Sequence, residues 1–192
     1  MVDAMPSSPN DMRTAAAVVF LDLQEEIVKN SRTVALPSLR VRAAALAKLA
    51  ALHGLPVFAS SVGVGGAYLS DVLENVAVEP RPRLETSAFA DAGLVEALAA
   101  SGRRALILAG VASEIVVQRT ALDARAAGYE VFVAVDACGG VSARTEEAAW
   151  RRIVQAGGVT TSVTTFAAEL AGDFTTELGG QTLGIMYATL GE

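Results

Sequence analysis

The stretch Ala105-Leu-Ile-Leu-Ala-Gly110, followed directly by Val111-Ala-Ser-Glu-Ile-Val-Val-Gln118, decides the fold of this chain. Its first six residues form an uninterrupted apolar run, which is typical of a strand buried on both faces of a sheet. Its last eight residues open a helix that we expect to span about 113–127 and to end before Gly128. A buried strand that turns at once into a helix predicts one unit of an α/β fold.

The same alternation of apolar strands and helices extends along most of the chain. We expect further strands over 15–21, 55–60, 76–78, 130–136 and 159–163, and further helices over 36–52, 91–100 and 145–155. This order predicts right-handed crossovers and a three-layer α/β/α fold around a mostly parallel, doubly wound sheet of about six strands. Ligands of such sheets bind at the carboxyl ends of the strands, and this rule places Asp22, Gly110 and Cys138 on one edge.

Length and composition limit the classes of protein to which the chain can belong. The chain has 192 residues, and 52% of them are hydrophobic. We therefore expect a flexible leader over 1–14, followed by a single domain over 15–192. The net charge of -6 argues against nucleic-acid binding, and no apolar run approaches the roughly 20 residues that cross a membrane. The single cysteine cannot form an internal disulfide, which fits the reducing cytoplasm.

Four segments, in this order, resemble the isochorismatase-like cysteine hydrolases. Phe20-Leu-Asp-Leu-Gln24 is similar to the first-strand motif of that family, and Arg83-Leu-Glu-Thr-Ser-Ala-Phe89 is similar to its Lys-x-x-x-Ser-Ala-Phe loop. Ala109-Gly-Val-Ala-Ser-Glu-Ile-Val-Val117 resembles the nucleophile turn Gly-Val-x-Thr-x-x-Cys-Val, and Gly128-Tyr-Glu-Val-Phe-Val-Ala-Val-Asp-Ala137 resembles the strand that follows it. Within the family, the resemblance is strongest to small multimeric bacterial hydrolases of unassigned substrate.

The resemblance implies a set of site residues. The family's catalytic triad is an aspartate base, a lysine and a nucleophilic cysteine, and these positions fall here on Asp22, Arg83 and Val116. The resemblance also implies a cis peptide, which falls at Val111–Ala112, and an oxyanion hole made by the backbone N–H groups of Ala112 and Val116. The lysine and the cysteine of the family are therefore both replaced in this chain.

These replacements predict which chemistry survives. Valine has no lone pair and no proton, so thiol attack on a carbonyl, worth several orders of magnitude in rate, is expected to be lost. Backbone donors do not depend on the side chain at Val116, and the guanidinium of Arg83 can hold a carboxylate but is a poor proton carrier. We therefore predict a hydrolase-fold protein without thiol-dependent amidase activity. It keeps a pocket for a small carbonyl or carboxylate ligand and needs no cofactor.

A second interpretation keeps catalysis without the cysteine. Isochorismate-cleaving members of the family are similar to this chain in lacking it, and in them the aspartate protonates a vinyl ether. Asp22 could serve here as that general acid. Those members carry glycine at the position of Val116 and keep the lysine that Arg83 replaces, so the pocket is expected to be smaller here.

Several residues allow both a functional and a structural role. Asp22 is either a catalytic group or a structural partner of Arg83, since a charge at this edge needs compensation. Cys138 is either a relocated nucleophile or a small buried hydrophobe, and Ser113 is more simply a helix cap than a nucleophile. We expect Ser113, Cys138 and the aromatic Phe89 to lie near the pocket. The only histidine, His53, is expected at a helix end on the opposite edge of the sheet, which rules out a Ser-His-Asp relay, and a zinc site lacks its ligand spacing.

Self-association is a separate expectation. The mean hydropathy of +0.42 is high for a small monomer, and proteins with the architecture of this family are usually homo-oligomers. Exposed apolar surface would then be covered by another subunit. The expected partners are a small-molecule ligand and further copies of the chain, with no nucleic acid and no membrane.

Overall fold

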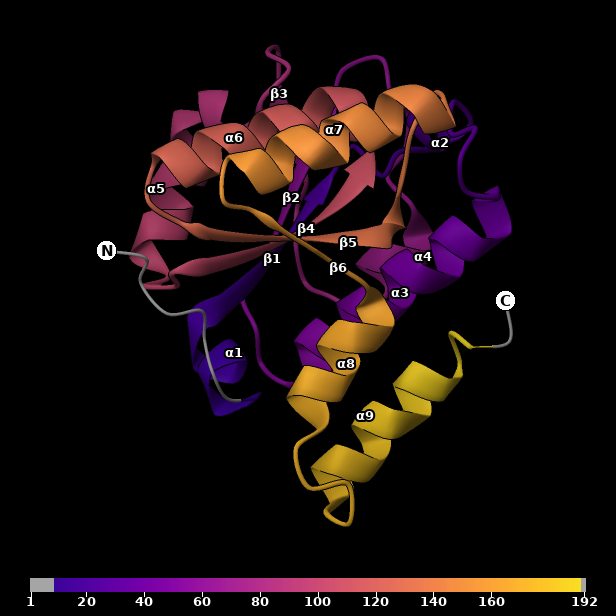
Figure 1. Ribbon diagram of the computed structural model, residues 1–192, viewed down its shortest axis with the longest axis vertical. Coiled ribbons are helices and arrows are strands. Elements are labelled where there is room, and N and C mark those ends of the chain that lie inside the picture. Colours follow the sequence, from indigo (N-terminus) through magenta and orange to yellow (C-terminus); the bar gives the residue numbers. More distant parts are fainter. Residues whose placement is uncertain (1–8, 191–192) are drawn as a thin grey trace.

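The computed structural model describes residues 9–190 as a sheet with helices on both faces (Figure 1). The expected leader lies only partly in this range. Its residues 1–8 are outside the described part, whereas helix α1 (Pro9–Ala15) takes up the rest. Met12 in α1 is buried, and Arg13 donates a hydrogen bond of 3.1 Å from Nε to the carbonyl of Leu170. This segment is thus packed onto the domain, because its apolar side chain and its arginine both find partners there.

Six parallel strands form one sheet in the order β3-β2-β1-β4-β5-β6. Their bounds are β1 (Ala16–Leu21), β2 (Val57–Val62), β3 (Arg81–Arg83), β4 (Ala105–Val111), β5 (Glu130–Gly139) and β6 (Val159–Thr161). β4 pairs with all of β1 at the centre, and every residue of both strands is buried. Uninterrupted apolar runs mark these strands because helices cover both faces of a central parallel strand. The predicted three-layer α/β/α fold with a doubly wound parallel sheet is confirmed.

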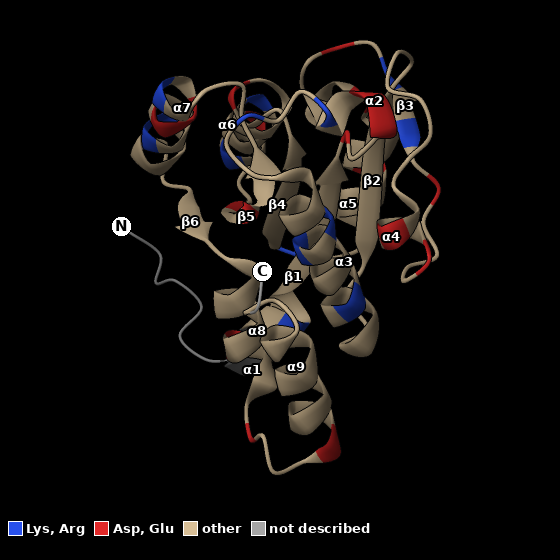
Figure 2. Ribbon diagram, turned by 90° about the vertical axis from the view of Figure 1, so that its right-hand side faces the viewer, with Lys and Arg blue, Asp and Glu red and all other residues tan. Residues whose placement is uncertain are grey.

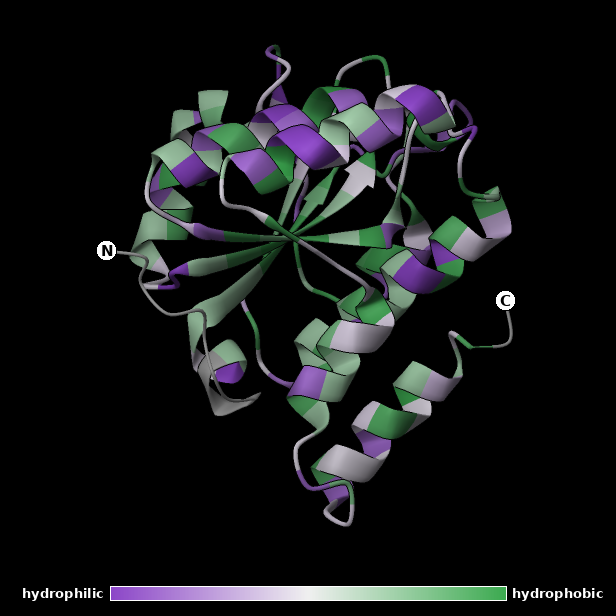
Figure 3. Ribbon diagram, viewed as in Figure 1, coloured by the Kyte–Doolittle hydropathy of each residue, from purple (hydrophilic) through white to green (hydrophobic). Residues whose placement is uncertain are grey.

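Longer helices form the two outer layers (Figure 1). One face carries α5 (Ala92–Ala100), η2 (Ser113–Val117), α6 (Gln118–Ala126) and α7 (Ala143–Gln155). The other carries α3 (Leu36–Leu52) and α8 (Val163–Ala171), against which α9 (Glu177–Tyr187) packs. The short helices α2 (Glu25–Val28), α4 (Ser70–Leu73) and η1 (Ala88–Ala90) lie in connections. Charged residues gather on helices and loops (Figure 2), whereas the strands are mainly hydrophobic (Figure 3).

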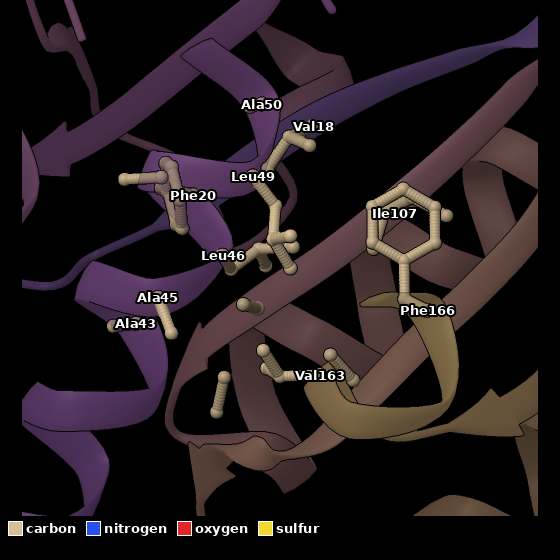
Figure 4. Close-up of a cluster of buried hydrophobic side chains, with 14 of the residues drawn as sticks. Val18, Phe20, Ala43, Ala45, Leu46, Leu49, Ala50, Ile107, Val163 and Phe166 are labelled. Atoms are coloured by element: carbon tan, nitrogen blue, oxygen red, sulfur yellow. The ribbon is translucent and has the colours of Figure 1, made fainter. Parts of the chain in front are cut away.

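Each face of the sheet has its own core, which follows from the alternation of side chains along β1. Val18 and Phe20 belong to a cluster with residues of α3 and α8 such as Leu46 and Phe166 (Figure 4). Val19 points the other way, into a cluster with residues of α5, α6 and α7. Because β1 is buried on both sides, it holds its carboxyl end, and the residue that follows it, in a fixed place.

The third strand differs from the expectation. Residues 76–78 form no strand, and β3 follows instead, pairing Arg81 with Ser60 and Arg83 with Val62 of β2. Because β3 consists of two arginines and Pro82, its sequence lacks the apolar pattern that predicts a strand. The proline is tolerated because β3 is at the edge of the sheet. The pairing matters for the site, because it brings the end of β3 beside the end of β2.

The C-terminal part, whose sequence from Thr165 has mixed helical character and two glycine clusters, adds the helices α8 and α9 to one outer layer. α9 contacts α3 and α8, and His53 at the end of α3 lies 2.8 Å from Thr182 of α9, measured from Nε2 to Oγ1. Among the residues that the structure describes, no helix combines the length and the apolar character that crossing a membrane requires.

The close approach of β1 and β4 requires the glycine at position 110. A Cβ atom added there would lie 2.0 Å from the carbonyl oxygen of Leu21. Gly110→Ala is therefore expected to push the two central strands apart and to lower the free energy of unfolding by about 1–3 kcal/mol or more. The control is Gly63→Ala, where an added Cβ meets nothing within 4 Å. Urea unfolding measures both, and equal stability of the two variants would contradict the close approach.

Candidate functional site

A cavity of about 550 Å³ opens at the carboxyl edge of the sheet. It lies at the ends of β1 and β4, between which the order of the strands reverses, and such a switch point is the usual ligand site of a doubly wound sheet. Its lining combines a few polar side chains with many apolar ones: Asp22, Asn30, Arg32, Arg83, Glu85 and Thr86, with Ile27, Val62, Leu84, Val111, Ala112, Ile115, Val116 and Val141. This composition is typical of a small-molecule site.

Asp22 and Arg83 form a buried ion pair in the cavity wall. Each terminal nitrogen of Arg83 contacts a different carboxylate oxygen of Asp22, and the Nη2–Oδ2 distance is 2.7 Å. Nη1 also donates to Oγ of Ser60 at 2.8 Å, whereas Nε has no hydrogen-bond partner among the described residues. The side chain of Arg83 is only 3% exposed, and that of Asp22 only 7%. The pair anticipated as the structural role of Asp22 is therefore formed.

The backbone around Asp22 holds its carboxylate in this position. Asp22 has a φ of 53°, a left-handed conformation that aspartate adopts more readily than most residues. Its N–H donates to the carbonyl of Ser60 at 3.0 Å, and its own carbonyl accepts from the N–H of Gln24 at 2.7 Å. Ser60, in β2, was missed by the sequence analysis, although it is the last residue of the strand predicted over 55–60 and this place was a usable signal.

The turn after β4 supplies the opposite wall. The peptide Val111–Ala112 is cis, as the resemblance implied, and the helix begins as the π-helical turn η2. The first hydrogen bond of the π-helical type, which joins residues five apart, runs from the N–H of Val117 to the carbonyl of Ala112 at 3.3 Å. The N–H of Val116 comes before that bond, in the part of a helix where backbone donors lack intrahelical acceptors. Ala112 and Val116 both line the cavity, next to Asp22 and Arg83.

Two of the expected pocket residues lie elsewhere. Ser113 is fully buried and donates from Oγ to Oε1 of Glu146 in α7 at 2.7 Å, so it neither caps its helix nor lines the cavity. Phe89 stacks edge-on against Tyr129, with ring centroids 5.8 Å apart, and borders a separate hollow. Both expectations failed because the partners, Glu146 and Tyr129, are distant in sequence.

Cys138, the third expected pocket residue, is part of a core. It is fully buried in β5, opposite Gly110 of β4, and does not line the cavity. Burial raises the pKa of its thiol, so that the thiol stays protonated and unreactive. β5 extends three residues beyond the expected end at Asp136, and this extension carries Cys138 into the sheet. Its role is therefore that of a small hydrophobe.

The mouth of the cavity comes from connections that the sequence analysis did not consider. The segment after α2 is fastened to the segment after β5, because the N–H of Arg32 donates to the carbonyl of Gly140 at 2.7 Å. The N–H of Gly140 in turn donates to Oγ1 of Thr33 at 2.8 Å. Within residues 9–190, no group of three or more histidine, cysteine, aspartate or glutamate side chains is placed to hold a metal ion.

Comparison with known proteins agrees with this geometry. The model of the isochorismatase domain family matches residues 16–165. A protein of Escherichia coli (strain K12) described as "Probable hydrolase YcaC" is 30% identical over 171 residues, which cover 86% of this chain and 82% of the relative.

Two solved structures share the fold closely. YcaC from Pseudomonas aeruginosa, with hexane-2,5-diol and covalent acrylamide, has a TM-score of 0.87 at 27% identity, covering 93% of this chain and 91% of the other. The YcaC gene product of E. coli, described as an octameric hydrolase of unknown specificity, also has a TM-score of 0.87, at 26% identity. This match covers 93% of this chain and 90% of the E. coli chain.

Proposed function

The chain belongs to the isochorismatase family, and we propose that it is a member without thiol-dependent amidase activity that binds a small carbonyl or carboxylate compound in the cavity at Asp22. The observation that carries the proposal is the placement of Val116. Its side chain lines the same cavity as Asp22 and Arg83, at the position where the family's motif has cysteine. The chain's single thiol, that of Cys138, is buried in β5.

Without a nucleophile in the cavity, covalent attack on a bound carbonyl has no starting atom. A solved structure of YcaC from P. aeruginosa holds covalent acrylamide, and we expect no such adduct at the cavity of this chain. The backbone N–H groups of Ala112 and Val116 remain as candidate donors to a carbonyl oxygen. The apolar wall would exclude water around that oxygen and so strengthen such hydrogen bonds.

Acid catalysis by Asp22 is the alternative that the family suggests. A general acid must present a protonated carboxyl oxygen to its substrate. Both carboxylate oxygens of Asp22 instead accept from Arg83, and the bulk of Val116 narrows the space that glycine would leave. We therefore favour binding over cleavage.

Binding and turnover can be measured on the same preparation. We expect the purified protein to bind compounds from a panel of primary amides, small esters and carboxylates by calorimetry, and to turn over neither these nor isochorismate. Val116→Phe should abolish binding by filling the cavity, whereas the same change at Val154, which is 52% exposed on α7, should leave it intact.

Circular dichroism checks that both variants are folded, and Val116→Ala, which enlarges the cavity instead, should still bind. Turnover that Asp22→Asn abolishes would overturn the proposal in favour of acid catalysis. Binding that survives Val116→Phe, or no binding of any compound, would overturn it as well.

We further propose that the chain forms a homo-oligomer. Large hydrophobic side chains are exposed on the single chain, among them Leu84, Val64 and Phe174 at 102%, 83% and 64%. Surfaces of this kind are usually covered in an assembly, and the YcaC gene product of E. coli is described as octameric. Sedimentation should give a multiple of 19.7 kDa, and a species of only that mass would contradict the proposal.

A further inference from the structure

The charges inside the cavity neutralise one another. Both terminal nitrogens of Arg83 are engaged by Asp22, and Nη1 is also bonded to Ser60. A charged group on a ligand could pair with Arg83 or Asp22 only by breaking a bidentate contact between buried ions, which is costly. The inner part of the cavity, with Val62, Val111 and Val116, therefore suits a neutral, apolar body.

The mouth of the cavity is different. Arg32 and Glu85 both line it, both are exposed, and within residues 9–190 neither side chain forms an ion pair or a hydrogen bond. They come from different segments, because Arg32 follows α2 and Glu85 follows β3. The backbone bond from Arg32 to Gly140 fixes the first of these segments. Two opposite charges therefore face one opening without neutralising each other.

We propose that the cavity takes a zwitterionic ligand, with its carboxylate at Arg32, its ammonium group at Glu85 and its apolar body in the inner cavity. This inference rests on the proposed binding function and names its ligand class. A ligand with one charge would be attracted by one of these side chains and repelled by the other. A ligand with both charges gains both attractions.

A series of compounds with one branched alkyl body separates these contributions. Leucine carries both charges, and 4-methylpentanoate carries only the negative one. 3-Methylbutylamine carries only the positive charge, and 3-methylbutan-1-ol carries none. Exposed ion pairs are weak, so we expect leucine to bind about three to five times more tightly than either singly charged compound. Raising the ionic strength from about 0.02 M to about 0.5 M should largely remove this preference, because salt screens exposed charges.

Two variants assign the charges. Arg32→Gln should remove the advantage of leucine over 3-methylbutylamine, and Glu85→Gln should remove its advantage over 4-methylpentanoate. The matched control is Arg152→Gln, since Arg152 is exposed on α7, forms no ion pair within residues 9–190 and does not line the cavity. That variant should keep the preferences of the natural protein.

Dissociation constants from calorimetry decide the outcome. Equal binding of leucine and the alcohol, or preferences that Arg32→Gln and Glu85→Gln leave unchanged, would overturn the zwitterion inference. The proposed binding function would stand in that case, because it depends on the response to Val116→Phe and not on ligand charge. Failure of every compound in both panels would overturn the two together.

Discussion

The double variant Val116→Cys, Arg83→Lys is expected to hydrolyse primary amides that the natural protein leaves intact. The first change places a thiol in the cavity wall beside Asp22. The second replaces a guanidinium that occupies both carboxylate oxygens by an ammonium group, a point charge that can leave one oxygen free to accept the thiol proton. Loss of a catalytic nucleophile typically costs several orders of magnitude, so we expect ammonia release at least about 100-fold above background.

Alkylation gives a second measurement of the same prediction. Iodoacetamide should add one mass increment to the double variant and none to the natural protein, because burial raises the pKa of the Cys138 thiol. Val116→Cys alone should react more slowly, since Arg83 then still holds Asp22. Labelling of Cys138 in the natural protein would contradict the protection of that thiol by burial. A double variant that remains unlabelled and inactive would show that position 116 does not face a reactive site.

The central strands of the fold could be predicted from the sequence, and the reason is physical. The runs that form β1 and β4 are apolar at every position because both faces are covered, so their pattern is unambiguous. β3 carries no such pattern, since it is an edge strand of three residues with two arginines. The family motif nevertheless identified Arg83, and the pairing of β3 with β2 explains how it reaches Asp22.

Side-chain partners were harder to predict than strands. Serine at the start of a helix favours a cap, but the hydroxyl of Ser113 instead donates a hydrogen bond of 2.7 Å to the carboxylate of Glu146. The mouth residues Arg32 and Glu85 belong to connections whose course depends on contacts with distant segments. Local patterns carry no information about such contacts, so only the structure could place these charges at the cavity.

Asp22→Asn is expected to lower the free energy of unfolding by about 3–5 kcal/mol, because it leaves the charge of Arg83 buried without its partner. Asparagine is suited to isolate the charge, since it also tolerates the positive φ at this position. Urea unfolding at pH 7 measures the change. The control is Asp91→Asn, which loses the ion pair with Arg81, a residue whose side chain is 44% exposed. Asparagine still caps helix α5 there, so this variant should lose about 1 kcal/mol or less.

The double variant Asp22→Asn, Arg83→Met, measured together with Arg83→Met alone, completes the thermodynamic cycle. With both charges removed, no buried ion is left uncompensated, so most of the stability lost in the single variant should return. Recovery would mean that the pair is held by mutual neutralisation, and that a ligand cannot draw Arg83 away from Asp22 without meeting the same cost. If Asp22→Asn is instead as mild as Asp91→Asn, Arg83 has another way to satisfy its charge. The inner cavity could then accept an anion directly, and the reason for placing ligand charges at the mouth would disappear.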